Sequence, residues 1–152
     1  MIFKIIPAVV AVAVIAVLVF LAGCSWKRPS NLGVVEGKLR ECPSTPNCVS
    51  SQSARENSRV EAIVFQGTPE EARKNLLAVL EGMPRTKIIK NDGNYLHAEF
   101  TTALFRFVDD VEFLFDNTAG VINVRSASRV GRSDFGANRK RVEDIRVRFS
   151  GK

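Results

Sequence analysis

Five arginines crowd the region from Arg125 to Arg141, around a serine-rich loop that leads into a predicted helix. Arginine forks and the free N–H groups of a helix N-terminus bind phosphate or carboxylate well. The sequence therefore predicts an anion-binding site near this helix start, formed by Arg125, Arg129, Arg132, Ser133 and Arg139. Two alternatives stay open. The arginines could form internal ion pairs, with Asp134 occupying the helix end, or they could serve catalysis.

The pair Asp109-Asp110 is a second candidate, because it lies amid aromatic residues. Paired carboxylates can act as acid and base when their environments separate their pKa values. Adjacent residues on a strand point to opposite faces, however, so a hydrolase that used both aspartates would need a β-bulge at this point. The alternative is structural: one carboxylate pairs with an arginine of the serine-rich loop, and the other faces water.

The remaining polar residues give no pattern for catalysis or metal binding. His97, the only histidine, alternates with Tyr95 and Glu99 on the more polar face of a predicted strand, so we expect it to be solvated. No spacing of serine, histidine, aspartate or cysteine supports nucleophilic catalysis. A metal site would need more histidine or free cysteine than the chain offers. We therefore predict no catalytic residue, no metal and no cofactor, and favour a protein that is not an enzyme.

The first 23 residues have the order of a signal peptide. Lys4 precedes an apolar run over residues 5–22, and Leu21-Ala22-Gly23-Cys24 closes it with the small residues that suit a signal-peptidase cleft. This tetrapeptide resembles the bacterial lipobox, whose cysteine becomes the first mature residue and carries diacylglycerol as a thioether. The resemblance implies lipidation (palmitate) at Cys24 and a place in the cell envelope. Ser25 after the cysteine favours the outer membrane over the inner one.

An uncleaved signal anchor is the alternative for this segment. The apolar run of about 18 residues is longer than most signal-peptide cores and long enough to span a bilayer. Trp26, Lys27 and Arg28 follow directly, as residues at a membrane interface would. Either interpretation holds the chain at a membrane through its N-terminus.

Cys42 and Cys48 enclose five residues, two of them proline. In an exported chain these thiols lie outside the cytoplasm, where a pair of cysteines is normally oxidised. We therefore predict a Cys42–Cys48 disulfide that fixes the proline-rich turn. Free or transient thiols are the alternative, although a redox motif usually has the shorter Cys-x-x-Cys spacing.

Two segments follow the leader. Residues 24–38 contain Pro29, Gly33 and scattered charges without sustained periodicity, which predicts a flexible tether. Residues 39–150 then form a single domain, whose length is enough to bury a core.

The sequence of the predicted domain contains signals for both strands and helices. Thr68-Pro69-Glu70-Glu71 has the sequence of a capping box and starts a helix that ends near Met83. Ser133 or Asp134 is expected to cap a second helix that runs to about Phe149. Strands are predicted at residues 59–65, 86–90, 95–101, 105–116 and 121–126. Because short turns join the middle strands, we predict a two-layer α+β sandwich, a mainly antiparallel sheet with two helices on one face.

Three stretches in this order resemble the domain-of-unknown-function family numbered 1499, which occurs in bacterial envelope proteins and plastid-type proteins. They are Cys42–Ser51, Leu104–Phe113 and Val124–Arg139, and the resemblance covers residues 39–149. The family has no established activity. The resemblance therefore implies the domain boundaries and an envelope setting, and it implies no reaction.

The overall charge points to an anionic partner. The net charge is +6, or +5 (6 − 1) when Lys4 leaves with the leader. An exported protein meets little nucleic acid, so anionic headgroups or acidic ligands are the expected partners, unless the basic residues are merely solvated. We predict an envelope lipoprotein, facing the periplasm, that binds an anionic envelope component or a protein partner. A structural or assembly lipoprotein and a hydrolase are the alternatives, and the oligomeric state is left open.

Overall fold

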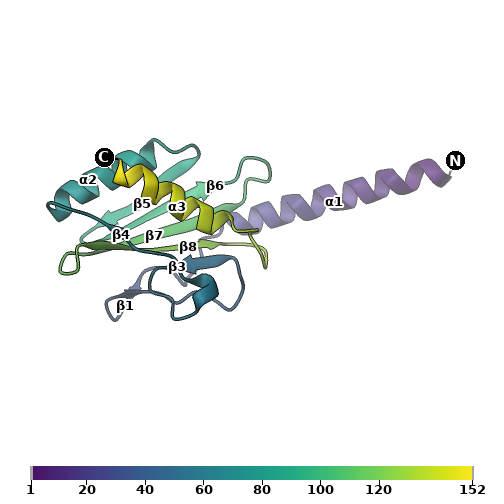
Figure 1. Ribbon diagram of the computed structural model, residues 1–152. Helices are drawn as coiled ribbons and strands as arrows, with labels where there is room; N and C mark the ends of the chain where they lie inside the picture. Colours follow the sequence, from purple (N-terminus) through teal and green to yellow (C-terminus); the bar gives the residue numbers. More distant parts are fainter. Residues whose placement is uncertain (1, 152) are drawn as a thin grey trace.

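The computed structural model describes residues 2–151, without the side chains of residues 2–9, 21 and 22. A long helix, α1 (Ile2–Trp26), projects from one end of a domain built on a sheet and two further helices (Figure 1). Within the side chains that are described, no helix is both long and apolar enough to cross a membrane. Met1 and the side chains of Leu21 and Ala22, which belong to the predicted leader, lie outside the described residues.

The domain is built on a six-stranded, antiparallel sheet in the order β3-β8-β7-β6-β5, with β4 paired to β8. Its strands are β3 (Cys48–Ser50), β4 (Ile63–Val64), β5 (Thr86–Asp92), β6 (Tyr95–Thr101), β7 (Val108–Asp116) and β8 (Val121–Ser128). Strands β5 to β8 pair in chain order, β5 with β6, β6 with β7 and β7 with β8, because short connections link them. A short 3-10 helix, η1 (Glu56–Ser58), follows β3.

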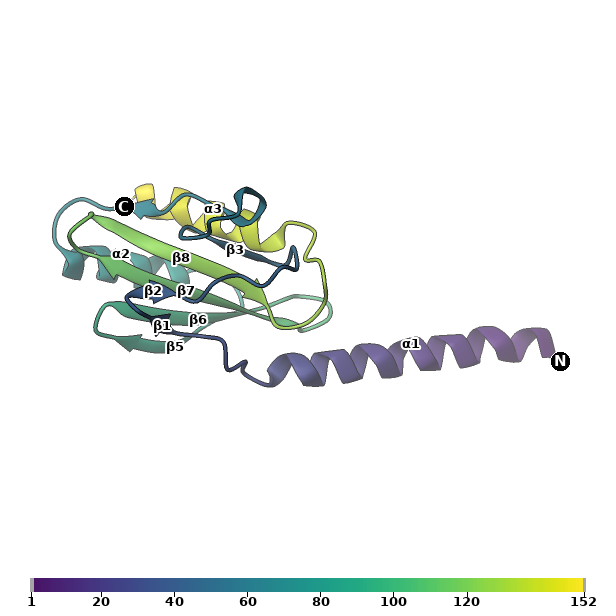
Figure 2. The same cartoon turned by 90° about the horizontal axis from the view of Figure 1, so that it is seen from below.

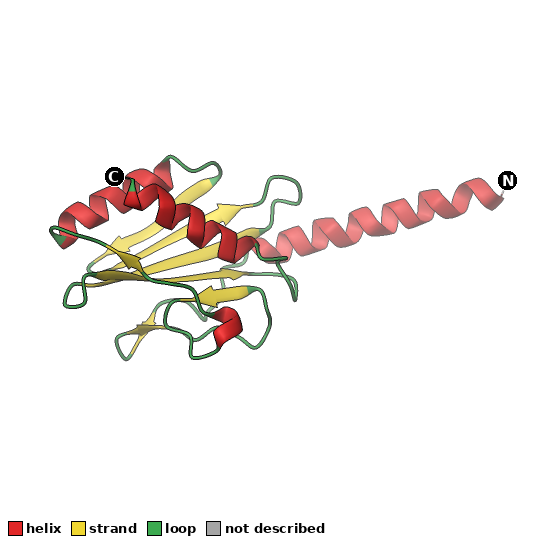
Figure 3. Ribbon diagram, in the orientation of Figure 1, coloured by secondary structure: helices red, strands yellow, loops and turns green. Residues whose placement is uncertain are grey.

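Two helices cover one face of this sheet (Figure 3). Helix α2 (Pro69–Glu81) begins at a capping box in which Thr68 and Glu71 bond each other's backbone N–H groups. Helix α3 (Ala137–Ser150) packs beside it. The apolar side chains of both helices and of the covered sheet face form the core, with Leu76, Leu80, Phe113, Ile122 and Ile145 fully buried. The predicted α+β sandwich with a mainly antiparallel sheet is confirmed.

The opposite face of the sheet carries polar and charged side chains. We call it the polar face, formed by Tyr95, His97, Glu99, Asp110, Glu112, Arg125 and Arg129. The strand register places these residues beside one another, because His97 lies opposite Glu112, Glu99 lies opposite Asp110, and Glu112 lies opposite Arg125. In a two-layer fold this face would be expected to meet water.

The chain that follows α1 covers the polar face instead (Figure 2). We call residues 25–40, which include the last two residues of α1, the strap. It contains two very short strands, β1 (Val34–Val35) and β2 (Lys38–Leu39), which pair with each other, and β2 packs against β7 and β8. Leu39 is buried. The structure therefore has an ordered segment where a flexible tether was predicted for residues 24–38. Contacts with side chains distant in sequence keep this segment ordered.

Three predicted elements begin later than their sequences suggested. The strand predicted at residues 59–65 is reduced to β4, Ile63–Val64. Helix α3 starts at Ala137 and not at residue 133 or 134, because Phe135 and Gly136 have the positive φ angles of 53° and 81° that a helix cannot contain. Strand β7 starts at Val108 and not at Phe105. Residues 102–107 form a loop, closed by a hydrogen bond from the backbone N–H of Thr102 to the carbonyl oxygen of Phe107 (2.8 Å).

Candidate functional site

The polar face concentrates ionisable groups that have almost no contact with water. His97, Asp110, Glu112 and Arg125 are each exposed by 4% or less. Removing a charged group from water is unfavourable unless partners compensate for the lost hydration. A cluster of such groups away from the core is therefore a candidate functional site.

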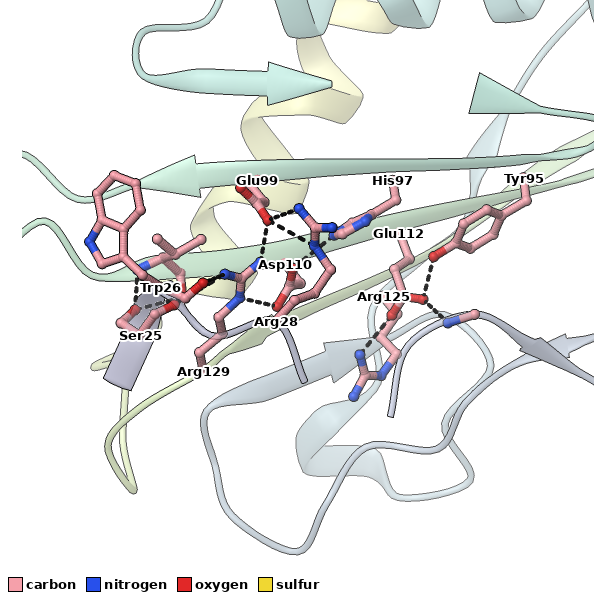
Figure 4. Close-up of polar contacts among 12 residues, drawn as sticks. Ser25, Trp26, Arg28, Tyr95, His97, Glu99, Asp110, Glu112, Arg125 and Arg129 are labelled. Atoms are coloured by element: carbon pink, nitrogen blue, oxygen red, sulfur yellow. Dashed lines mark hydrogen bonds and ion pairs between the residues drawn. The ribbon is translucent and has the colours of Figure 1, made fainter. Parts of the chain in front are cut away.

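Arg129 is the centre of the first part of this network (Figure 4). Its Nε and Nη2 donate to the two carboxylate oxygens of Asp110, both at 2.7 Å, and Nη2 also donates to Glu99. Glu99 accepts a further bond from Arg28 of the strap at 3.0 Å. Nη1 of Arg129 donates to the backbone carbonyl oxygen of Ser25 at 3.1 Å. One guanidinium thus joins the sheet to the residue that follows Cys24.

Glu112 is the centre of the second part (Figure 4). Its Oε2 accepts from Nη1 of Arg125 at 2.7 Å, and its Oε1 accepts from the hydroxyl of Tyr95 at 2.8 Å. Oε1 also accepts from the backbone N–H of Gly33 in the strap, at 2.6 Å. Hydrogen bonds from the sheet and from the strap therefore together stabilise the buried charge of this carboxylate.

The pKa values in this network follow from its contacts. Burial would raise the pKa of Asp110, but hydrogen bonds from Arg129 and His97 outweigh it, so the pKa lies below its usual range. Burial acts in the same way on Glu99, and hydrogen bonds from Arg129 and Arg28 again lower its pKa overall. Burial, with the charge of Glu112, raises the pKa of Tyr95, which therefore stays a neutral donor. The network keeps both carboxylates ionised at neutral pH.

A cavity of about 220 Å³ opens beside this network. Arg125, Ala127 and Arg129 line it from the sheet, Asn31 from the strap, and Thr45 from the loop that follows Cys42. Its volume is below the roughly 300–1,000 Å³ of common small-molecule sites, so it suits a small ligand or a single headgroup. Nε of Arg125 is buried and has no hydrogen-bond partner among the described residues. Arg125 therefore lines the cavity, and its side chain has a buried N–H donor for which the described residues supply no acceptor.

The structure separates the five residues predicted to bind an anion at the helix start. Only Arg125 and Arg129 lie together, on the polar face. Arg132 and Ser133 are exposed in the loop before α3, and Arg139 donates to the backbone carbonyl oxygens of Arg59 and Asn57. The predicted site at the helix start is not formed as a unit. The sheet intervenes, because alternate residues of β8 face away from α3.

Asp134 occupies the helix start by itself. Its carboxylate accepts from the backbone N–H of Gly136 at 3.0 Å and of Asn138 at 2.8 Å. These are the free donors that the predicted anion would have used. The internal alternative left open by the sequence is therefore the arrangement found at this position.

Asp109 and Asp110 point to opposite faces, so the geometry offers no paired carboxylates for a hydrolase. Asp109 pairs with Arg141 of α3 at 2.5 Å, whereas Asp110 lies on the polar face. The structural alternative is right that one aspartate, Asp110, pairs with an arginine of the serine-rich loop, Arg129. It is wrong in leaving the other aspartate in water, because both are buried. His97 is also not solvated: its Nε2 lies 2.7 Å from Oδ1 of Asp110.

The predicted disulfide is present between Cys42 and Cys48, whose Cα atoms lie 5.6 Å apart. It closes the loop that brings Thr45 and Asn47 to the cavity. Asn47 is itself fixed, because its side-chain amide donates to the carbonyl oxygen of Gly131 at 2.6 Å. The disulfide thus shapes one wall of the site. Cys24 is a free, exposed cysteine in the part of the chain that is described.

Sequence reasoning missed Glu99, Glu112 and Tyr95 as members of one site. A signal was present, because polar residues recur at every second position of β6 and at Asp110 and Glu112 of β7. Such alternation predicts a face but not whether it is buried. In the described part of the chain, no group of three or more His, Cys, Asp or Glu side chains is placed to hold a metal ion.

Comparison with known proteins assigns the chain to a family. A family described as a protein of unknown function (DUF1499) matches residues 38–149, and the chain belongs to this family. The match spans the strands and helices of the domain and begins at β2. Among curated proteins, none matches the chain in sequence.

Proposed function

We propose that this protein is an envelope lipoprotein, anchored through Cys24, whose domain binds a small carboxylate- or phosphate-bearing ligand in the cavity beside Arg125. The observation that carries the binding proposal is the spare donor of Arg125. Its side chain is 1% exposed, the residue lines the cavity, and in the described part of the chain its Nε has no partner. A buried donor without an acceptor destabilises the fold by about 1–3 kcal/mol, so an acceptor supplied by a ligand is favoured.

The balance of charges defines what kind of ligand fits. Arg28, Arg125 and Arg129 face the carboxylates of Glu99, Asp110 and Glu112, three cations against three anions. The site therefore has no large excess of positive charge. Its selectivity rests on a directed N–H donor and on volume, which favours a compact oxyanion over a long polyanion.

The anchoring proposal rests on the N-terminal segment. The sequence Leu21-Ala22-Gly23-Cys24 resembles a lipobox, and Cys24 is exposed and available for acylation. An envelope setting also suits a domain with an internal disulfide. The periplasmic side and the outer membrane are part of this proposal.

Titration of the full chain in detergent micelles tests the cavity. The NMR resonance of the Arg125 Nε–Hε group is followed as inorganic phosphate or acetate is added. We expect a saturable shift with at least one of the two anions. Absence of any saturable shift with both would overturn the binding proposal.

Two variants make the titration specific. Ala127→Leu fills the cavity and leaves every charge in place, so it should abolish the saturable shift. Arg148→Gln removes an exposed arginine of α3 far from the cavity lining, and should leave the shift unchanged. A shift that persists in Ala127→Leu would place binding outside the cavity.

A further inference from the structure

Two loops and the end of α1 meet at one end of the domain. The loop of residues 102–107 joins β6 to β7, and the loop of residues 129–136 joins β8 to α3. Ser25 lies between them: its hydroxyl accepts from the backbone N–H of Val108 at 2.5 Å, and its carbonyl oxygen accepts from Arg129. Figures 1 and 2 show α1 leaving the domain at this end. We call this surface the anchor-side rim.

The anchor-side rim exposes large apolar side chains. Phe135 is 99% exposed, Leu104 78%, Trp26 62% and Phe105 43%. A single exposed apolar residue needs no explanation, but several on one small surface mark a site of interaction. The anchor-side rim is therefore better suited to contact with an apolar partner than with water.

Both loops hold these side chains outward by specific local structure. In the first loop, Phe105 stacks on Phe107 with ring centroids 5.6 Å apart, and the backbone N–H of Phe107 donates to the hydroxyl of Thr102 at 2.9 Å. In the second, the carboxylate of Asp134 accepts from the backbone N–H groups of Gly136 and Asn138, directly after Phe135. Arg106 and Phe135 have positive φ angles of 57° and 53°, which are unfavourable for bulky residues. The chain thus retains local strain that presents apolar groups to the outside.

Basic residues surround these apolar groups. Lys27, Arg106 and Arg132 are exposed, and among the described residues none of the three forms an ion pair. Exposed apolar tips with adjacent Lys and Arg are the combination that binds an anionic lipid surface. Tryptophan, as in Trp26, is also enriched at membrane interfaces.

We propose that the anchor-side rim rests on the membrane surface, with Leu104, Phe105 and Phe135 entering the headgroup region of anionic lipids. This inference rests on the proposed anchoring at Cys24. Adjacent Cα atoms are about 3.8 Å apart, so an acylated Cys24 would hold Ser25, and with it both loops, next to the headgroups. The ordered strap leaves no free length by which the domain could leave the surface. Because the anchor-side rim lies directly beside the proposed anchor, a lipid bilayer is the favoured partner.

Tryptophan fluorescence in the anchored full chain tests this proposal. The chain, with Trp26→Phe to remove the only native tryptophan, is reconstituted into vesicles of phosphatidylethanolamine and phosphatidylglycerol with or without brominated acyl chains. Leu104→Trp and Phe135→Trp should each lose emission in the brominated vesicles. Val64→Trp is the matched control, since Val64 is 69% exposed at the far end of β8, and it should keep its emission.

The outcomes separate docking from anchoring. Vesicle flotation shows whether the chain is attached at all, and loss of flotation would contradict the anchor. If the chain floats but the three tryptophan variants are quenched equally or not at all, the docking proposal is wrong and the anchor stands. A concentration-dependent change in emission without quenching would show that the rim binds another copy, and would overturn docking as well.

Discussion

Ser25 is the residue at which the predicted anchor and the domain meet. It is fully buried, its hydroxyl and carbonyl oxygen both bond to the domain, and its neighbour Cys24 is exposed. A buried serine directly after an exposed cysteine means that a modification of the thiol can be accommodated while the following residue stays fixed. The geometry is thus compatible with acylation at Cys24 without any rearrangement of the strap.

We predict that Cys24 is the N-terminal, lipid-modified residue of the mature protein. Intact mass spectrometry of protein extracted from membranes should show loss of residues 1–23 and the added mass of acyl chains. Cys24→Ala should prevent both changes, because no other side chain at this position can form the thioether. A mature chain that still begins at Met1 would instead support the signal-anchor alternative.

At the scale of elements, the strap covers the polar face of the sheet and the disulfide loop lines the cavity beside it. In other folds, a further layer of helices or strands covers such a face. The strap supplies Gly33 to the buried carboxylate of Glu112 and Arg28 to the half-buried carboxylate of Glu99. The loop closed by Cys42 and Cys48 supplies a wall of the cavity. Neither segment has a regular structure of useful length. Their order therefore depends on side-chain contacts and on the covalent bond.

Loss of the disulfide should affect both stability and the site. In chain-entropy terms, a disulfide that closes so short a loop contributes about 2–3 kcal/mol to the free energy of unfolding. The Cys42→Ser/Cys48→Ser double variant should lose about this amount in urea denaturation, and its Arg125 resonance should respond more weakly to phosphate. A double variant as stable as the wild type with its disulfide intact would contradict this role.

For the whole molecule, the polar face ties global stability to pH. The pKa values of Asp110 and Glu99 are lower in the folded chain than in the unfolded chain, where they are about 3.9 and 4.3. Their contribution to stability is therefore fully present above the unfolded values, and it is lost as pH falls through the lower folded values. The fold should weaken below about pH 4–5 as these carboxylates take up protons.

Glu99→Gln provides the test of this linkage. Without one of the two carboxylates, the free energy of unfolding should fall less steeply between about pH 5 and pH 3 than in the wild type. Urea denaturation at each pH measures the slope. Glu61→Gln removes the same charge from an exposed position outside the network, and its slope should follow that of the wild type. Parallel slopes for Glu99→Gln and the wild type would contradict the proposed linkage.

Local signals in the sequence were enough to predict much of the domain. The capping box at Thr68 and the hairpin turn before Tyr95 are encoded by neighbouring residues. Helix α2 and strand β6 occur where these signals place them, and strand β5 runs two residues further than predicted, to Asp92. The disulfide was also predicted, from two cysteines six positions apart that enclose a proline-rich turn. These features depend on interactions between residues close in sequence, which a pattern can show.

The candidate site was decided by tertiary structure. Arg129 bonds to Ser25 across 104 positions and Gly33 bonds to Glu112 across 79, and no periodicity reports contacts of that length. The alternation of polar and apolar residues on β6 and β7 predicted a polar face, but it could not show that another segment covers this face. His97 was therefore expected in water and is found buried against Asp110. Whether a charged residue is solvated or compensated depends on which distant segment packs over it, and only the folded chain determines that.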